Sequence, residues 1–199
     1  MISPLETIVG AQKKLLRKPI TSDITIKCGD RTWRCQSAIL SQRCEFFRVA
    51  TVGGFKEAEL RTITLNDDDA EGVDLMLVYL YTLEVSKLFD ITTAEMCFTL
   101  GDKYDLQVFR TAGYEHLLSR LDWTIWSLQD ESAKTLFVAF LYQLWTWNMK
   151  DSDDLRAAVV QNFSRLGRAL IEYEPFQKLL EVNAAFSLAL VRALLKATG

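Results

Sequence analysis

The chain has 199 residues, of which 49% are hydrophobic, including 11 Phe and 5 Trp. This length and apolar content support a folded chain with a sizeable core, arranged as one large or two small domains. The net charge is -3 at pH 7, and acidic and basic residues are spread evenly along the chain, which argues against nucleic-acid binding through electrostatics.

The first predicted element is a short helix over residues 3–17. Ser3, Pro4 and Glu6 form a capping box with proline at the first helical position. An apolar stripe then follows one side of the helix and consists of Leu5, Ile8, Val9, Leu15 and Leu16. The pattern is compatible with packing of the stripe on its own domain and with contact to a second copy of the chain.

A β-hairpin is predicted next, over residues 23–36. Residues 23–28 alternate between apolar and polar side chains, and Gly29-Asp30 is a two-residue connection before a second short strand. Alternation around a tight turn that contains glycine is typical of a hairpin.

A helix is predicted to follow the hairpin directly. Ser37 stands where a helix N-cap belongs, and apolar residues at helical spacing continue to Ala50. The helix is expected to end near Gly53-Gly54. Phe55-Lys56-Glu57 then follows outside any periodic pattern, as an exposed candidate for contact with another molecule.

The next predicted elements complete a mixed half of the chain. Residues 60–65 alternate as a third strand, and the acidic run from Asn66 to Asp69 caps a helix that continues through Tyr81. Thr92-Thr93-Ala94-Glu95 is a second capping box, which opens the first of two helices that end near Leu121.

The rest of the chain reads as helix without a strand candidate. Three helices are predicted, over residues 134–147, 151–171 and 176–195. Since isolated helices are marginally stable in water, these helices are expected to pack on one another. The predicted fold class is therefore α+β, a small sheet with a cluster of helices, followed by an all-α extension.

Several short stretches resemble the BTB/POZ domain, and most of all its fungal members. They are Ser22-Asp23-Ile24, the join from Trp33 to Leu40, Glu45-Phe46-Phe47, Gly54-Phe55-Lys56-Glu57-Ala58 and Leu80-Tyr81-Thr82. The resemblance implies a BTB/POZ domain over residues 5–121 and a helical extension over residues 122–199. Two residues depart from the family pattern: Gln36 stands in place of the usual His, and Leu83 in place of the usual Gly.

The sequence offers little that points to catalysis, and we expect a protein that is not an enzyme. The only histidine is His116, and neither a phosphate-binding loop nor a nucleophile with its base is recognisable. The cysteines, at 28, 35, 44 and 97, lack the spacing of a zinc site. No cofactor or metal is expected.

Location and membrane association are predicted from the same features. Lys13 and Lys14 interrupt the early apolar residues, so no signal peptide is expected, and no run is long enough to span a bilayer. Cysteines without close pairing suit a reducing compartment, which predicts a cytoplasmic or nuclear protein without a membrane or nucleic-acid partner.

The resemblance implies a binding module, and two uses are open. In the first, the chain is an adaptor that docks a cullin scaffold of a RING-type ubiquitin ligase. Members of the family that do so carry an apolar-x-Glu motif after the first main helix, which Phe55 and Glu57 match. Equally, Phe55 could belong to the core of its own domain, with Glu57 solvated.

In the second use, the chain is a homodimeric scaffold or a transcription-associated protein without cullin binding. The resemblance places Leu5, Ile8, Val9, Leu15 and Leu16 at the dimer interface. Transcription factors of the family pair an acidic residue with an Arg in a pocket that recruits co-repressors. Asp23 matches the acid, but Ser37 replaces the Arg, so this charge pairing is lost.

Overall fold

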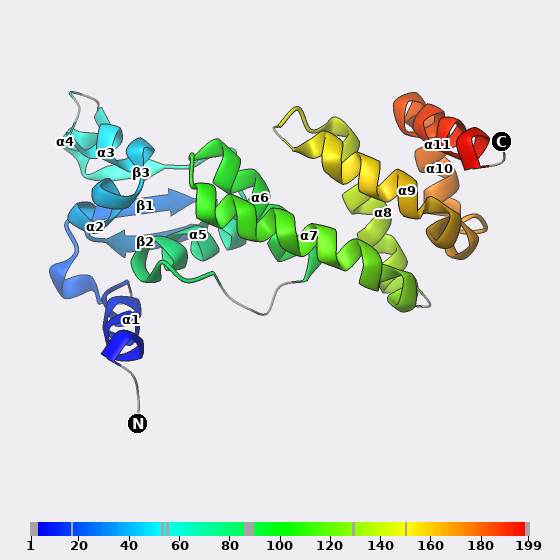
Figure 1. Ribbon diagram of the computed structural model, residues 1–199. Coiled ribbons are helices and arrows are strands. Elements are labelled where there is room, and N and C mark those ends of the chain that lie inside the picture. Colours follow the sequence, from blue (N-terminus) through cyan, green and yellow to red (C-terminus); the bar gives the residue numbers. More distant parts are fainter. Residues whose placement is uncertain are drawn as a thin grey trace. The chain divides into compact units, whose positions relative to one another are not determined.

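The computed structural model describes residues 4–16, 18–52, 54, 56–85, 90–128, 130–149 and 151–197. The chain folds as two compact units, residues 1–88 with 96–113 and residues 89–95 with 114–199. The first unit holds the sheet and the second is helical among its described residues (Figure 1). This arrangement agrees with the predicted α+β class with a helical extension.

The sheet of the first unit has three strands in the order β2-β1-β3. Strands β1 (Ile24–Cys28) and β2 (Arg31–Cys35) pair antiparallel, with Ile24 opposite Cys35 and Cys28 opposite Arg31. Gly29 has φ 51° in the turn between them, a conformation that glycine adopts without steric cost. Strand β3 (Thr62–Thr64) pairs parallel with β1. The predicted hairpin and third strand are confirmed.

The helix predicted from Ser37 to Ala50 is two helices, α2 (Ser37–Arg43) and α3 (Glu45–Val52). Cys44 separates them with extended backbone, at φ -148° and ψ 121°. Its buried thiol lies 3.7 Å from the carbonyl oxygen of Tyr104, to which it donates. The single-helix prediction was wrong because a contact distant in sequence holds this break.

The start of α2 is built differently from the prediction. Ser37 is the first helical residue, and Gln36 precedes it as N-cap without a side-chain bond. Instead, Asp23 accepts from the Ser37 backbone N–H at 2.7 Å and from the Ser37 hydroxyl. The helix is therefore capped by a carboxylate from the start of the hairpin, and the prediction of Ser37 as N-cap was wrong.

Helix α5 (Ala70–Thr82) carries much of the core of the first unit. Asp69 caps it by accepting from the backbone N–H groups of Glu71 and Gly72, as predicted for the acidic run. Its fully buried side chains include Val73, Met76, Leu77, Leu80 and Tyr81. The helix ends at Leu83, which has φ 57°, in the left-handed region that glycine occupies freely.

The remaining elements of the first unit surround this core. Helix α1 (Pro4–Leu15) packs against α5 and leads into the short 3-10 helix η1 (Pro19–Thr21). Helix α4 (Lys56–Leu60) follows α3 and packs against it. The β1-β2 hairpin lies between α1 on one side and α3 and α4 on the other (Figure 1).

Helices α6 (Ile91–Lys103) and α7 (Gln107–Ser127) follow, and each is shared between the two units. Asp90 accepts from the Thr93 backbone N–H at 2.7 Å, so the cap of α6 is Asp90 and not the predicted Thr92. Gly101 permits close approach to α7, because a Cβ atom there would lie 2.6 Å from the backbone of Arg110.

The second unit also contains α8 (Glu131–Thr146), α9 (Ser152–Leu170), α10 (Glu174–Val182) and α11 (Ala184–Ala197). Asn183 divides the last predicted helix into α10 and α11, and its side chain accepts from the Phe186 backbone N–H at 3.0 Å. The rings of Phe176 and Phe186 meet edge to face in the core, 6.0 Å apart. The predicted division between residues 121 and 122 stays a prediction.

Candidate protein-docking site

An exposed apolar face runs along α3. Phe46 and Val49 are each 40% exposed and Val52 is 74% exposed, whereas Phe47 is fully buried. Residues at spacings of three lie on the same broad side of a helix. Leu60, at the end of α4, is 71% exposed and adds to the apolar area. We call the surface formed by Phe46, Val49, Val52, Leu60 and Glu57 the α3-α4 surface.

The ring of Phe46 rests on a fixed platform. It meets Tyr104 edge to face with ring centroids 4.9 Å apart, and the Tyr104 hydroxyl donates to Asp68. Lys103 binds the same carboxylate at 2.7 Å. Burial raises the pKa of Tyr104 and the bond to Asp68 raises it further, so the hydroxyl stays protonated. A side chain held in this way loses little conformational freedom when a partner binds.

The predicted contact pair is only partly described. Glu57 lies in the first turn of α4 with an exposed side chain, and a carboxylate at a helix N-terminus is favourable there. Phe55 lies outside the described residues. The segment was expected to be irregular, but Lys56 and Glu57 begin a helix that packs against α3. Glu57 thereby lies on a helix that packs against α3.

Sequence reasoning missed most of this surface. The apolar residues up to Ala50 were interpreted as one helical pattern, but Phe46 is 40% exposed and its neighbour Phe47 is fully buried, because consecutive helical residues point about 100° apart. Val49 and Val52 continue from Phe46 at intervals of three on the exposed side. That interval is the signal in the sequence from which a second apolar stripe could have been predicted.

The predicted dimer-interface residues lie on α1. The side chains of Leu5 and Ile8 are outside the described part of the structure. Val9 and Leu15 are half-buried and Leu16 is buried. Leu16 therefore belongs to the core of its own unit, while Val9 and Leu15 keep part of their surface exposed.

Asp23 and Ser37, which the resemblance matches to two positions of the co-repressor pocket, are joined by hydrogen bonds. Both oxygens of Asp23 accept from Ser37, and Arg61 approaches Asp23 at 3.7 Å. Burial acts to raise the pKa of Asp23, but the bonds from Ser37 and the Arg61 charge outweigh it, and the pKa is lowered. In this chain the carboxylate serves as a helix cap.

The side chains that could support chemistry are dispersed. All four cysteines are free and buried, and burial raises the pKa of Cys35 and of Cys97 to about 12, so these thiols are poor nucleophiles at neutral pH. His116 lies half-buried on α7. Within the described ranges, no group of three or more His, Cys, Asp or Glu residues is arranged to hold a metal ion. Nor does any described helix have the length and apolar character to cross a membrane.

Comparison with known proteins identifies the class. The model of the BTB/POZ domain family matches residues 12–121, which is more than half of the chain. The chain belongs to this family of protein-interaction domains. The predicted resemblance is confirmed for these residues, whereas the likeness to fungal members and the extension of the likeness beyond residue 121 stay predictions.

Curated relatives match about half of the chain. Kelch repeat and BTB domain-containing protein 6 of Homo sapiens is 30% identical over 94 residues, which cover 47% of this chain and 14% of that protein. Kelch-like protein 41 of Mus musculus is 28% identical over 109 residues, which cover 55% of this chain and 18% of that protein. The chain thus spans less than a fifth of the length of these relatives.

One solved structure is also matched. The BTB domain of zebrafish PATZ1 matches with a TM-score of 0.44 and 14% sequence identity, over 56% of this chain and 85% of that domain.

Proposed function

We propose that this protein is a BTB adaptor that docks a cullin scaffold of a RING-type ubiquitin ligase through its α3-α4 surface. It acts by binding, without catalysis. The observation that carries the proposal is the exposed apolar face of Phe46, Val49 and Val52 on α3, together with the exposed Glu57 on α4, which packs against α3. The family resemblance assigns cullin docking to an apolar-x-Glu motif at this place in the chain.

The physical properties of the surface suit a protein partner. Burying an exposed aliphatic side chain contributes roughly 1.5–3 kcal/mol, and Val52 and Leu60 are the most exposed of the apolar group. The Glu57 carboxylate adds charge complementarity, which mainly sets orientation and association rate. Phe55, three residues after Val52, supplies the aromatic anchor that protein interfaces favour.

The experiment that tests this proposal is co-elution of the purified chain with a cullin N-terminal domain in gel filtration. The wild-type chain is expected to co-elute, and Phe55→Ala combined with Glu57→Ala is expected to abolish the complex while circular dichroism stays unchanged. A complex that survives both substitutions refutes the site, and a wild-type chain that never co-elutes refutes the function.

A homodimeric scaffold is the second candidate function. It is favoured by the half-buried Val9 and Leu15 on α1, which leave apolar surface for a second copy. A transcription-associated role has less support, since Asp23 is engaged by Ser37 in place of the Arg of the co-repressor pocket. Light scattering across a concentration series tests self-association: a monomer at every concentration excludes a stable dimer.

The proposal places the chain in the cytoplasm or the nucleus. Four free, buried cysteines suit a reducing compartment. Fluorescence microscopy of the tagged chain tests this, and a secreted product would contradict it.

A further inference from the structure

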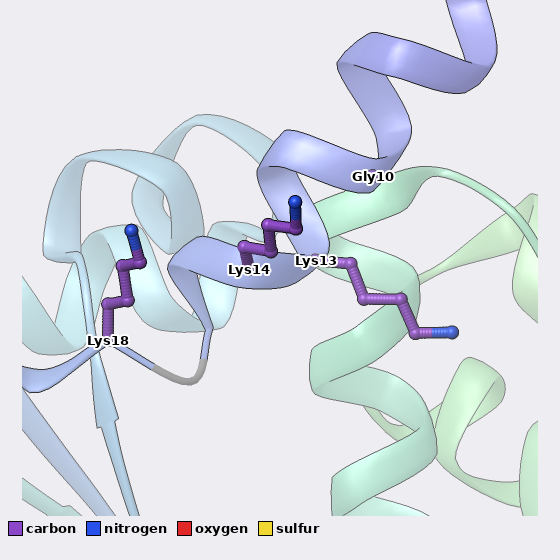
Figure 2. Close-up of a pocket in the computed structure, with 4 residues that line it drawn as sticks. All are labelled: Gly10, Lys13, Lys14 and Lys18. Atoms are coloured by element: carbon purple, nitrogen blue, oxygen red, sulfur yellow. The ribbon is translucent and has the colours of Figure 1, made fainter. Parts of the chain in front are cut away.

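A hollow in the first unit lies beside α1, away from the α3-α4 surface. It is an open pocket of about 440 Å³, and among the described residues it is lined by Gly10, Lys13, Lys14 and Lys18 (Figure 2). The wall is mainly apolar, and the lysine side chains project from the last turns of α1 and from the segment after it. We call this feature the α1 pocket.

Gly10 keeps the α1 pocket open. A Cβ atom at this position would meet no other atom within 4 Å, so close packing does not require glycine there. Glycine inside a helix is also less favourable than alanine. The absence of a side chain at Gly10 leaves space, because the helix presents bare backbone to the pocket where a side chain would otherwise stand.

The charges around the α1 pocket have one sign. Lys13, Lys14 and Lys18 are exposed, and within the described ranges no carboxylate forms an ion pair with any of them. The chain as a whole has a net charge of -3, so this group is a local positive region on an acidic protein. Such a region attracts anionic partners.

We propose that the α1 pocket binds an acidic, amphipathic segment of a protein partner. An apolar side chain of that segment enters the hollow beside Gly10, and flanking carboxylates pair with the three lysines. This inference stands apart from cullin docking, because α1 and α3 lie on different sides of the β1-β2 hairpin (Figure 1). One chain can therefore hold a partner at each surface.

An anionic membrane is the rival partner, and the packing of α1 disfavours it. A helix that binds a lipid surface inserts an apolar face into the headgroup region. Here α1 packs against α5, and Leu16 directly after it is buried in its own unit. Leu16 is thus turned toward the protein and Val9 and Leu15 are half-buried, so this segment offers a partner a concave hollow with a basic rim.

Fluorescence anisotropy with short labelled peptides tests the proposal on the full chain. One probe repeats Glu-Glu-Leu, a second repeats Glu-Glu-Gly, and a third repeats Gln-Gln-Leu. Sedimentation with vesicles of equal parts phosphatidylcholine and phosphatidylserine tests whether the chain binds an anionic membrane instead. The expected result is that the Glu-Glu-Leu peptide binds more tightly than either other peptide and that the vesicles do not bind the chain. Preference for vesicles, or equal binding of the two acidic peptides, overturns the proposal.

The contribution of the lysine charges to peptide binding is tested separately from that of the hollow. Replacing Lys13, Lys14 and Lys18 together by Gln is expected to weaken binding of the Glu-Glu-Leu peptide about tenfold, since each exposed ion pair is weak. The matched control replaces Lys27, Arg31 and Arg34 by Gln, which removes the same charge from exposed positions on the hairpin.

Gly10→Leu fills the hollow and leaves the lysines in place. It is expected to remove the preference for the Glu-Glu-Leu peptide over the Glu-Glu-Gly peptide, with the fold checked by circular dichroism. Equal weakening by the two triple variants, or a preference that survives Gly10→Leu in a folded chain, refutes the α1 pocket as the site.

Discussion

Gln36 and Tyr81 exchange two hydrogen bonds across the corner where β2 leads into α2. The Tyr81 hydroxyl accepts from the Gln36 backbone N–H at 2.8 Å and donates to the Gln36 side-chain oxygen. The Gln36 amide nitrogen also donates to the Thr21 hydroxyl at 3.0 Å. Gln36, which replaces the usual His of the family, thus joins the hairpin corner to α5 and to η1.

Removing the Tyr81 hydroxyl tests the importance of this corner. Tyr81→Phe deprives the N–H of the half-buried Gln36 of its acceptor. A fully buried donor without a partner costs roughly 1–3 kcal/mol, and a half-buried one costs less. The melting temperature in differential scanning fluorimetry is expected to fall. Tyr142→Phe, at a half-exposed position on α8, is the matched control and should leave it unchanged. Equal melting temperatures for both variants would contradict the role of the corner.

Leu83 is a position where a substitution should stabilise the protein. It has φ 57° and is 55% exposed, so it has backbone strain without a large packing contribution. The left-handed conformation costs a non-glycine residue roughly 1–2 kcal/mol. Leu83→Gly relieves that cost but adds chain entropy to the unfolded state. The expected net gain is about 1 kcal/mol, a rise of roughly 2–4 °C in melting temperature. A fall would show that the Leu83 side chain stabilises more than its backbone costs.

The stability that the Asp23 cap gives to α2 is expected to depend on pH. Its pKa is lowered from the ordinary 3.8 in the folded state, so it contributes stability that is present above pH 3.8 and is lost as pH falls through the folded value. Ser37→Ala removes the hydroxyl that donates to this carboxylate. The variant is therefore expected to melt below the wild type at pH 7, with a smaller difference at pH 3.

The comparison uses melting curves over this pH range. Ser41→Ala, at a second serine on α2 whose hydroxyl donates to the Ala38 carbonyl of its own helix, is the control and should show no such trend. If Ser37→Ala lowers the melting temperature by the same amount at pH 7 and at pH 3, protonation of Asp23 is not the cause.

Gly101 is expected to be intolerant of a methyl group. A Cβ atom there would lie 2.6 Å from the Cα and backbone nitrogen of Arg110, and backbone atoms cannot move aside as a flexible side chain can. Overpacking of this kind costs roughly 1–3 kcal/mol. Gly101→Ala should lower the midpoint of urea unfolding. Gly10→Ala, at a helical glycine with open space, should leave the midpoint unchanged or raise it. If both variants lower the midpoint equally, the close approach of Gly101 to Arg110 is contradicted.

Local signals predicted the elements that local chemistry defines. The hairpin follows from alternation around Gly29, and the start of α5 follows from the capping carboxylate of Asp69. The break at Cys44 could not be predicted in this way, because no glycine or proline marks it and the contact that holds it is to Tyr104, 60 residues away. The break at Asn183 did carry a signal, since Asn is a favoured N-cap residue.

The candidate site was predictable only in part. Glu57 was identified through a family motif, and its exposed position on α4 is compatible with that role. The apolar face of α3 was missed because periodicity shows that a helix has an apolar side but not which of two stripes is buried. Phe47 is fully buried and Phe46 is 40% exposed, and both rings pack on Tyr104, a residue distant in sequence that directly follows α6.

The most direct test of the account is the affinity of a cullin N-terminal domain, measured by isothermal titration calorimetry, for matched pairs of variants. Glu57→Ala and Val52→Ala change the α3-α4 surface. Their controls are Glu59→Ala, an exposed acid on the same helix, and Ile20→Ala, an apolar residue that is 93% exposed on η1. The account predicts that the wild type binds, that each surface variant loses about tenfold in affinity, and that both controls bind as the wild type does. No binding by the wild type, or equal loss in variants and controls, would contradict it.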